Sequence, residues 1–508
     1  VCISFYQPGI EWWFPYEWRH APADIARFRA WMKGRYGSIG AVNRVWSAAY
    51  ANFDGIEDPA FDAPTVYQKE RTGLAPLRIL GEKRSYGNPS AAWYDWSKYW
   101  ESVAARTIGG LSAKVKKLDP SRPTMSWVTN SYAFGSQWDY VQWSSVPMDA
   151  VARDAPGVDV LGLQLSSSYG DPYQISFGLD VARKYGKPMS VLDLLDFSLG
   201  VKTGFHNMMR ATHASIQHGG SSFYYCCWAG AKDFEFFPDW STEEMRRMIG
   251  EAKKSLAWMK GTEIKARGAI VNPYLPTVSS PWQPMQSPHS LMGWYKLLEL
   301  AGETVDVVTL DDLGRASGRL KKYDYVLLPD CPVMDRPAAE ALQGYAKGGR
   351  LILGGRPPQR DPQNRPLSFA SGTRSAMLTD FGTALIGDPV RSNNAGDTPP
   401  MFDLSKIDYG RTVPMLDALR GAMAKLKVPP ASVQCSGGKV ITKTDFRYRG
   451  GRGIYLVNHR PEAASVVVTA KAKRVSALID GVERKIETDG KTIKIPPFER
   501  AAILKMDQ

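Results

Sequence analysis

The hydrophobic pattern of the first half of the chain alternates between short apolar runs and longer stretches with helical spacing. Apolar runs that predict strands cover 1–7, 123–128, 158–165, 188–192 and 222–228. Helical spacing predicts helices at 22–36, about 94–117 and 205–218. In the second of these helices, Trp100, Thr107 and Leu111 are expected on the buried face. Strands that alternate with helices are typical of parallel βα units.

The pattern changes near Glu263. Further strands are expected at 267–271, 305–309, 325–329 and 348–354, with helices at 291–300 and 338–346. This order predicts a small doubly wound sheet, and the segment 357–403, rich in Pro, Gly and Asn, is expected to form a long loop. From about Ser432, short strands alternate with turns, which favours a small antiparallel β-sandwich.

These changes predict a division of the chain into four parts. They are a parallel α/β domain at 1–262, a doubly wound domain at 263–392, a linker with a helix at 393–431 and a β-sandwich at 432–508. A chain of 508 residues is too long for one hydrophobic core, so several domains are expected. No apolar run approaches the roughly 20 residues of a membrane-spanning helix, so no membrane association is expected.

The net charge of +13 does not by itself define a partner. Lys and Arg are spread along the chain and no known nucleic-acid motif is present, so nucleic acid is not expected as a partner. An anionic substrate and a generally basic surface both remain open. The five Cys and six His residues show no metal-ligand spacing, and no glycine-rich nucleotide-binding turn follows a strand. Neither a cofactor nor a metal is therefore expected.

The run FRAWMKGRYGSIGAVNRVW, which covers residues 28–46, is the most distinctive motif of the chain. With Tyr50 and Asp54 beyond it, it resembles a segment of the glycoside hydrolases of family 42, the β-galactosidase-like enzymes. The aromatic residues Trp31, Tyr36 and Trp46 would also suit the core of any α/β domain.

The resemblance implies a (β/α)8 TIM-type barrel, then a flavodoxin-like domain of the kind that forms trimers, then a small C-terminal β-sandwich. In the register of the family, the five predicted strands are the fourth to the eighth of the barrel. The first three strands are then expected upstream of Val1, so the chain is expected to be a fragment or to form a barrel that another polypeptide completes.

Hydrolysis of a glycoside needs two carboxyl groups at the carboxyl ends of barrel strands. The family places an Asn-Glu pair after the first strand recognised here, but this chain has Gln7 and then Glu11. We expect Glu11 to be the proton donor, with its pKa raised by the neighbouring aromatic residues. Alternatively, Glu11 and Glu17 are both solvated loop carboxylates and Gln7 marks a lost acid.

The second carboxylate is expected at the end of the strand that follows Pro188, where the family has Glu and this chain has Asp193. Asp is one methylene shorter, which withdraws the carboxylate by about 1.5 Å. Asp196 is the next candidate, and a salt-bridged Asp193 without a catalytic role is the other reading.

Further residues are expected to bind the sugar. Asn130 matches the end of the family's fifth strand, Trp228 is expected to form a platform for a sugar ring, and Trp12, Tyr169 and Asp196 are expected in the cleft. The predicted function is hydrolysis of a β-linked sugar at the non-reducing end of an oligosaccharide or polysaccharide, by a homo-oligomer that the resemblance suggests is a trimer.

The alternative is a catalytically inactive carbohydrate-binding or assembly protein on the same fold. The sequence leaves open the sugar, the linkage, the retaining or inverting outcome, and the compartment, whether a bacterial cytoplasm, a periplasm or the medium.

Overall fold

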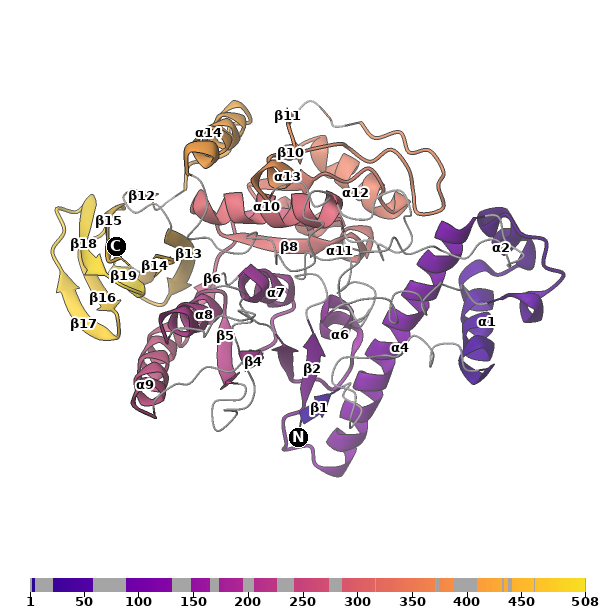
Figure 1. The fold of residues 1–508 in the computed structure, drawn as a ribbon, viewed down its shortest axis with the longest axis horizontal. Helices are drawn as coiled ribbons and strands as arrows, with labels where there is room; N and C mark the ends of the chain where they lie inside the picture. The colour runs from indigo at the N-terminus through magenta and orange to yellow at the C-terminus, as the bar shows by residue number, and fades with distance from the viewer. Residues whose placement is uncertain are drawn as a thin grey trace, which may run out of the picture.

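The computed structural model describes most of the chain in separate ranges. They are residues 2–4, 22–57, 88–129, 148–164, 173–194, 205–225, 242–273, 286–315, 317–370, 372, 374–386, 409–431, 434–436, 441–460 and 462–507. Within these ranges a parallel sheet, a second parallel sheet and an antiparallel sandwich follow one another along the chain (Figure 1).

The first sheet is parallel throughout, and its five described strands lie side by side in the order of the sequence. These strands are β1 (Cys2–Ser4), β2 (Met125–Thr129), β3 (Val160–Gln164), β4 (Met189–Leu194) and β5 (Gly220–Tyr225). A doubly wound sheet reverses its strand order, whereas a barrel wall does not. The predicted barrel-type fold class is confirmed for this part of the chain.

Helices cover the face of this sheet that carries Leu161, Leu163 and Val191. They are α4 (Pro89–Leu118), α6 (Met148–Asp154), α7 (Tyr173–Arg183), α8 (Phe205–Gln217) and α9 (Thr242–Met259). The three strand residues belong to one buried cluster with residues of α4, α6, α7, α8 and α9. The βα pattern of the sequence thus becomes a sheet with an apolar layer of helices on one side.

The buried face of α4 differs from the predicted one. Leu111 is 42% exposed and Thr107 is exposed, whereas Ile108 is fully buried. The reason is Gly109: a Cβ at that position would lie 2.3 Å from Cδ of Pro156, so the backbone that follows α6 packs directly onto the helix. This close approach turns the Ile108 side of α4 inward.

The distinctive aromatic motif forms two helices that pack against α4, and Figure 1 shows them at the end of the molecule opposite the sandwich. They are α1 (Pro22–Tyr36) and α2 (Ile39–Trp46). Between them Gly37 adopts a left-handed backbone with φ 71°, and the Ser38 side chain caps α2 by accepting from the backbone of Ala41. The Tyr-Gly turn of the motif is therefore the junction of the two helices.

The second sheet has the strand order β8-β7-β9-β10-β11 and is parallel throughout. Its strands are β7 (Gly268–Asn272), β8 (Val305–Thr309), β9 (Tyr325–Pro329), β10 (Leu351–Gly354) and β11 (Ser375–Leu378), and its helices are α10 (Gln286–Leu300), α11 (Leu310–Arg315), α12 (Arg336–Ala346) and α13 (Phe381–Ile386). This is the flavodoxin-like order, as predicted. The expected long loop at 357–403 is wrong in part, because it contains β11 and α13.

Helix α14 (Tyr409–Lys425) follows, and then the antiparallel sandwich. One sheet has the order β12-β15-β18 and the other β17-β16-β19-β14-β13-β6. Their strands are β6 (Glu263–Ile264), β12 (Gln434–Ser436), β13 (Ile441–Tyr448), β14 (Gly451–Asn458), β15 (Ala464–Thr469), β16 (Arg474–Ile479), β17 (Val482–Ile486), β18 (Thr492–Phe498) and β19 (Ala501–Asp507). The predicted β-sandwich is confirmed, and β6 joins it from just after α9, while the exact domain boundaries stay predictions.

The six-stranded sheet is covered on both faces. One face forms the sandwich core with β15 and β18, and the other packs on Ile216 of α8 and Ala252 of α9. No helix in the described ranges is long and apolar enough to span a membrane.

Candidate functional site

The carboxyl ends of the five parallel strands form one edge of the first sheet. Thr129 of β2 pairs with Gln164 of β3, and Leu194 of β4 pairs with Tyr225 of β5. The ends of neighbouring strands therefore lie side by side. In barrels of this type, the loops at this edge build the active site.

Asp193 is the one predicted site residue whose backbone is described, and it is the fifth of the six residues of β4. The register with β5 is irregular at this point. Val191 pairs with Phe223 and Leu194 with Tyr225, so three steps along β4 match two steps along β5. An extra residue of this kind interrupts the alternation of side chains between the two faces, and such bulges are common beside active sites.

The remaining predicted site residues lie outside the described ranges. They are Glu11, Trp12, Asn130, Tyr169, Asp196 and Trp228. In sequence, Asn130 directly follows β2, Asp196 follows β4 by two residues and Trp228 follows β5 by three. Each of these three positions thus lies within three residues of the end of a strand that reaches the same edge of the sheet.

The scaffold behind this edge is tightly packed. Val128, Leu163 and Val191 occupy matching positions on three adjacent strands and are at most 3% exposed. Small polar residues accompany them: the Ser126 hydroxyl accepts a 3.3 Å hydrogen bond from the backbone nitrogen of Gly162, and Ser190 is buried. The strand ends are therefore carried by rigid elements.

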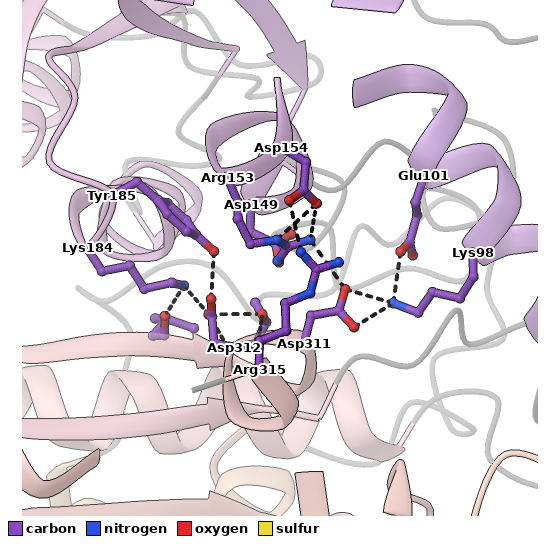
Figure 2. Close-up of polar contacts among 12 residues, drawn as sticks. Lys98, Glu101, Asp149, Arg153, Asp154, Lys184, Tyr185, Asp311, Asp312 and Arg315 are labelled. Carbon is purple, nitrogen blue, oxygen red and sulfur yellow. Dashed lines mark hydrogen bonds and ion pairs between the residues drawn. The ribbon is translucent and has the colours of Figure 1, made fainter. Parts of the chain in front are cut away.

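A second concentration of titratable groups lies between the first sheet's helices and α11 of the second sheet. We name it the interdomain charge cluster, and it consists of Lys98, Glu101, Asp149, Arg153, Asp154, Asp311 and Arg315. Figure 2 shows Asp311 on α11 facing Lys98 of α4 and Arg153 of α6. The Lys98 ammonium lies 2.8 Å from Glu101 and 3.1 Å from Asp311, so one cation bridges two domains.

Burial dominates the electrostatics of this cluster. It raises the pKa of Glu101 to about 7, although the charge of Lys98 acts in the opposite direction. Burial alone would lower the pKa of Lys98, but the charges of Glu101 and Asp311 outweigh it and raise the pKa. All four carboxylates of the cluster contact a cation, which favours a structural role.

A third buried group explains the aromatic motif. Asp95 on α4 is fully buried, and its Oδ2 accepts hydrogen bonds from the Tyr36 hydroxyl at 2.7 Å and the Trp46 indole nitrogen at 2.8 Å. Arg35 completes the set with an ion pair of 3.0 Å. The Phe28 ring meets the Trp96 ring edge to face at 4.8 Å. These aromatic residues therefore build a core around a carboxylate.

Sequence reasoning did not identify Asp95, Lys98 or Glu101. The available signal was their position: each is a charged residue within the aromatic first half of α4, where a solvated side chain would interrupt the buried face. Within the described ranges, no three His, Cys, Asp or Glu side chains are grouped so as to hold a metal ion.

Residues 16–229 match the family model of glycoside hydrolase family 42, described as beta-galactosidase. β-Galactosidase BgaH of Haloferax lucentense is 25% identical over 387 residues, which are 69% of this chain and 52% of that protein. A β-galactosidase of Arthrobacter sp is 24% identical over 360 residues, which are 65% and 46% of the two chains. The chain thus spans about half the length of these relatives.

Solved structures share the fold at low sequence identity. A catalytic mutant of Gan42B, a family 42 β-galactosidase from G. stearothermophilus, matches with a TM-score of 0.65 at 15% identity, covering 96% of this chain and 76% of that one. An exo-carrageenase of the same family from Bacteroides ovatus matches with a TM-score of 0.61 at 14% identity, covering 98% and 65%.

Proposed function

The chain belongs to glycoside hydrolase family 42, and we propose that it hydrolyses a β-linked, galactose-like sugar at the non-reducing end of its substrate. In this proposal Glu11 protonates the glycosidic oxygen. Asp193 attacks the anomeric carbon or activates the water that attacks it. The sugar follows from the names of the curated relatives, each of which is called a β-galactosidase.

The observation that carries this proposal is the position of Asp193. It lies at the carboxyl end of a parallel strand in a sheet with barrel-type order, inside the segment that matches the family. The extra residue in β4 also supports a catalytic Asp193. Asp is shorter than the Glu of the family, and a bulge at this point shifts the strand backbone and can compensate for the shorter side chain. Asp196 is the alternative second carboxylate.

The sugar-binding residues in this proposal follow strands of the first sheet in sequence. Asn130 contacts substrate hydroxyls, Trp228 packs on the apolar face of the sugar ring, and Trp12 and Tyr169 complete the cleft. Homo-oligomerisation, as a trimer, belongs to the same proposal, and light scattering on the purified chain measures it directly.

The test is hydrolysis of a chromogenic aryl β-galactoside by the full chain and its variants. Glu11→Gln and Asp193→Asn are each expected to lower kcat by at least about 100-fold, because each removes a group that acts in the transition state. Asp417→Asn is the matched control, since Asp417 is an exposed helix carboxylate that pairs with Arg420 at 3.2 Å. Addition of azide to Asp193→Ala is expected to restore part of the rate if Asp193 is a nucleophile.

The same assay separates the alternatives. Loss of activity in Asp196→Asn with full activity in Asp193→Asn would transfer the role to Asp196. Binding of galactose-containing oligosaccharides without any turnover would favour the inactive binding protein. The anomer released first, followed by proton NMR, distinguishes retention from inversion.

A further inference from the structure

One end of the C-terminal sandwich concentrates positive charge. We name it the cationic edge, and it consists of Arg447, Arg449, Arg452, Lys471, Lys473, Arg474 and Lys491. Every member except Arg452 is exposed, and Arg452 is half-buried. The seven residues come from the β13–β14 hairpin, the β15–β16 connection with the start of β16, and the turn before β18.

The register of the six-stranded sheet places these elements next to one another. Arg447 stands opposite Arg452, Gly451 opposite Asp507, and Asp507 opposite Arg474. These paired residues form a row that crosses β13, β14, β19 and β16. The row spans about 14 Å at the usual strand spacing of about 4.8 Å. Arg452 donates to the carbonyl of Lys471 at 3.4 Å, which brings the β15–β16 connection to the same row.

The charges of this edge are not neutralised within the described ranges. None of its seven cations forms an ion pair there, and the buried Nε of Arg452 has no hydrogen-bond acceptor. Arg447 and Arg452 face each other across two strands, and like charges in that position destabilise a sheet. Glu263 stands opposite Arg447 on the other side of β13, and a bound anion would further reduce the repulsion between the two arginines.

The acids near the edge are already engaged. Asp507 accepts a 2.7 Å hydrogen bond from the hydroxyl of Tyr448. Asp489 accepts from the backbone nitrogens of Lys491 at 2.7 Å and Thr492 at 2.5 Å. Glu487 is exposed, and Glu263 of β6 stands opposite Arg447 and pairs with Lys265. These four acids together do not balance the seven cations of the edge.

We propose that the cationic edge binds an acidic polysaccharide and so anchors polymeric substrate to the sandwich. The choice of a sugar polymer rests on the proposed function, whereas the binding of a linear polyanion rests on the edge itself. Single-stranded nucleic acid is less suited, because its binding sites add aromatic rings on which bases stack. The aromatic ring here is that of Tyr448, which the Lys505 ammonium covers at 5.3 Å.

The test measures binding of dextran sulfate, with neutral dextran of equal length as comparison, by calorimetry at 0.15 M salt. The edge variant carries Arg449→Glu, Lys473→Glu and Arg474→Glu. The control carries Lys253→Glu, Lys347→Glu and Lys425→Glu, which change the net charge equally at exposed positions of α9, the α12 terminus and α14. We expect the edge variant to lose at least about tenfold in affinity and the control less than about twofold.

Several results would overturn this inference. Equal losses in both variants would show that only net charge matters, and equal binding of neutral dextran would remove the role of charge. Tighter binding of duplex or single-stranded DNA, lost in the edge variant, would identify nucleic acid as the partner. If charge reversal prevents folding, Gln is placed at the same three edge positions instead. This variant is then expected to lose affinity for dextran sulfate by a smaller factor, whereas Gln at the three control positions is expected to leave the affinity unchanged.

The outcome is independent of catalysis. Hydrolysis of a small aryl galactoside is expected to be unchanged in the edge variant, because none of its three residues belongs to the proposed catalytic set. A chain without hydrolase activity whose dextran sulfate binding still depends on the edge would overturn only the proposed function. An active chain whose polymer binding ignores the edge would overturn only this inference.

Discussion

Asp95 on α4 accepts a hydrogen bond of 2.8 Å from the indole nitrogen of Trp46 on α2, a residue 49 positions earlier in the chain. The bond lies in an aromatic core that also holds Tyr36 and, at its border, Arg35. A single carboxylate therefore fastens the α1–α2 segment to the longest described helix.

Asp95→Asn is predicted to loosen this segment. It removes the charge partner of Arg35 and places the amide NH2 against another donor, either Arg35 or the Tyr36 and Trp46 pair, which costs about 3 kcal/mol for a buried group. Hydrogen exchange at 22–57 is expected to accelerate while exchange in the sandwich stays unchanged. The exposed pair of Asp417 provides the control, since Asp417→Asn is expected to change stability by less than about 0.5 kcal/mol. Uniform acceleration over the whole chain would contradict the assignment.

Two adjacent glycines of α4 give opposite predictions. Gly109→Ala is expected to destabilise the protein by about 1–3 kcal/mol, because the new Cβ would meet Pro156 at 2.3 Å. Gly110→Ala has nothing within 4 Å and is expected to stabilise the helix by about 1 kcal/mol. Thermal midpoints by calorimetry measure both, and a stabilising Gly109→Ala would contradict the close packing of α4 on the α6 side.

The raised pKa of Glu101 leads us to expect that the stability of the protein depends on pH below and near neutrality. Its pKa is raised to about 7 in the fold, so the folded protein holds a proton that the unfolded chain releases above the ordinary carboxyl pKa. The stabilisation is complete below about pH 4.5 and is lost as the pH rises to about 7, by about 3 kcal/mol in total. The thermal midpoint of the wild type is therefore expected to fall relative to that of Glu101→Gln over this interval. A constant difference would show that Glu101 does not titrate there.

For Glu251, whose pKa is lowered, we expect the opposite dependence of stability on pH. This α9 carboxylate lies 2.8 Å from Nε2 of His213, and Arg500 of the sandwich donates two bonds of 3.1 Å to it. Burial by itself would raise the pKa of Glu251, but His213 and Arg500 outweigh it and lower the pKa to about 2. The stabilisation is present above about pH 4.5 and is lost as the pH falls toward 2.

Glu251→Gln is therefore expected to cost about 3 kcal/mol at pH 7 and progressively less in acid. Thermal midpoints between pH 3 and 7 measure this, with Glu483→Gln as a control, because Glu483 makes an exposed 3.0 Å contact with Trp258 on the same helix. If Glu251→Gln lowers stability equally at pH 3 and pH 7, the charge of Glu251 does not stabilise its contact with His213 and Arg500.

Local patterns in the sequence were sufficient to predict several elements and their classes. The strands 305–309 and 325–329 and the helix 22–36 were predicted at their observed bounds, because continuous apolar runs and helical spacing are properties of a few neighbouring residues. The alternation of strands and helices also predicted a parallel sheet. For the proposed catalytic pair, the sequence supplied candidates: Asp193 is the fifth of the six residues of β4, and its catalytic role stays a prediction.

Features that depend on residues far apart in the chain followed from the packing of the whole fold. The face of α4 follows from its contact with Pro156, and β11 forms within an expected loop because β10 offers a paired edge. The partners of Asp95 and Glu251, and the Asp311 that pairs with Lys98, come from other helices or other domains. A buried charge is stable only where folding supplies its counterpart, and no local pattern records which distant residue that will be.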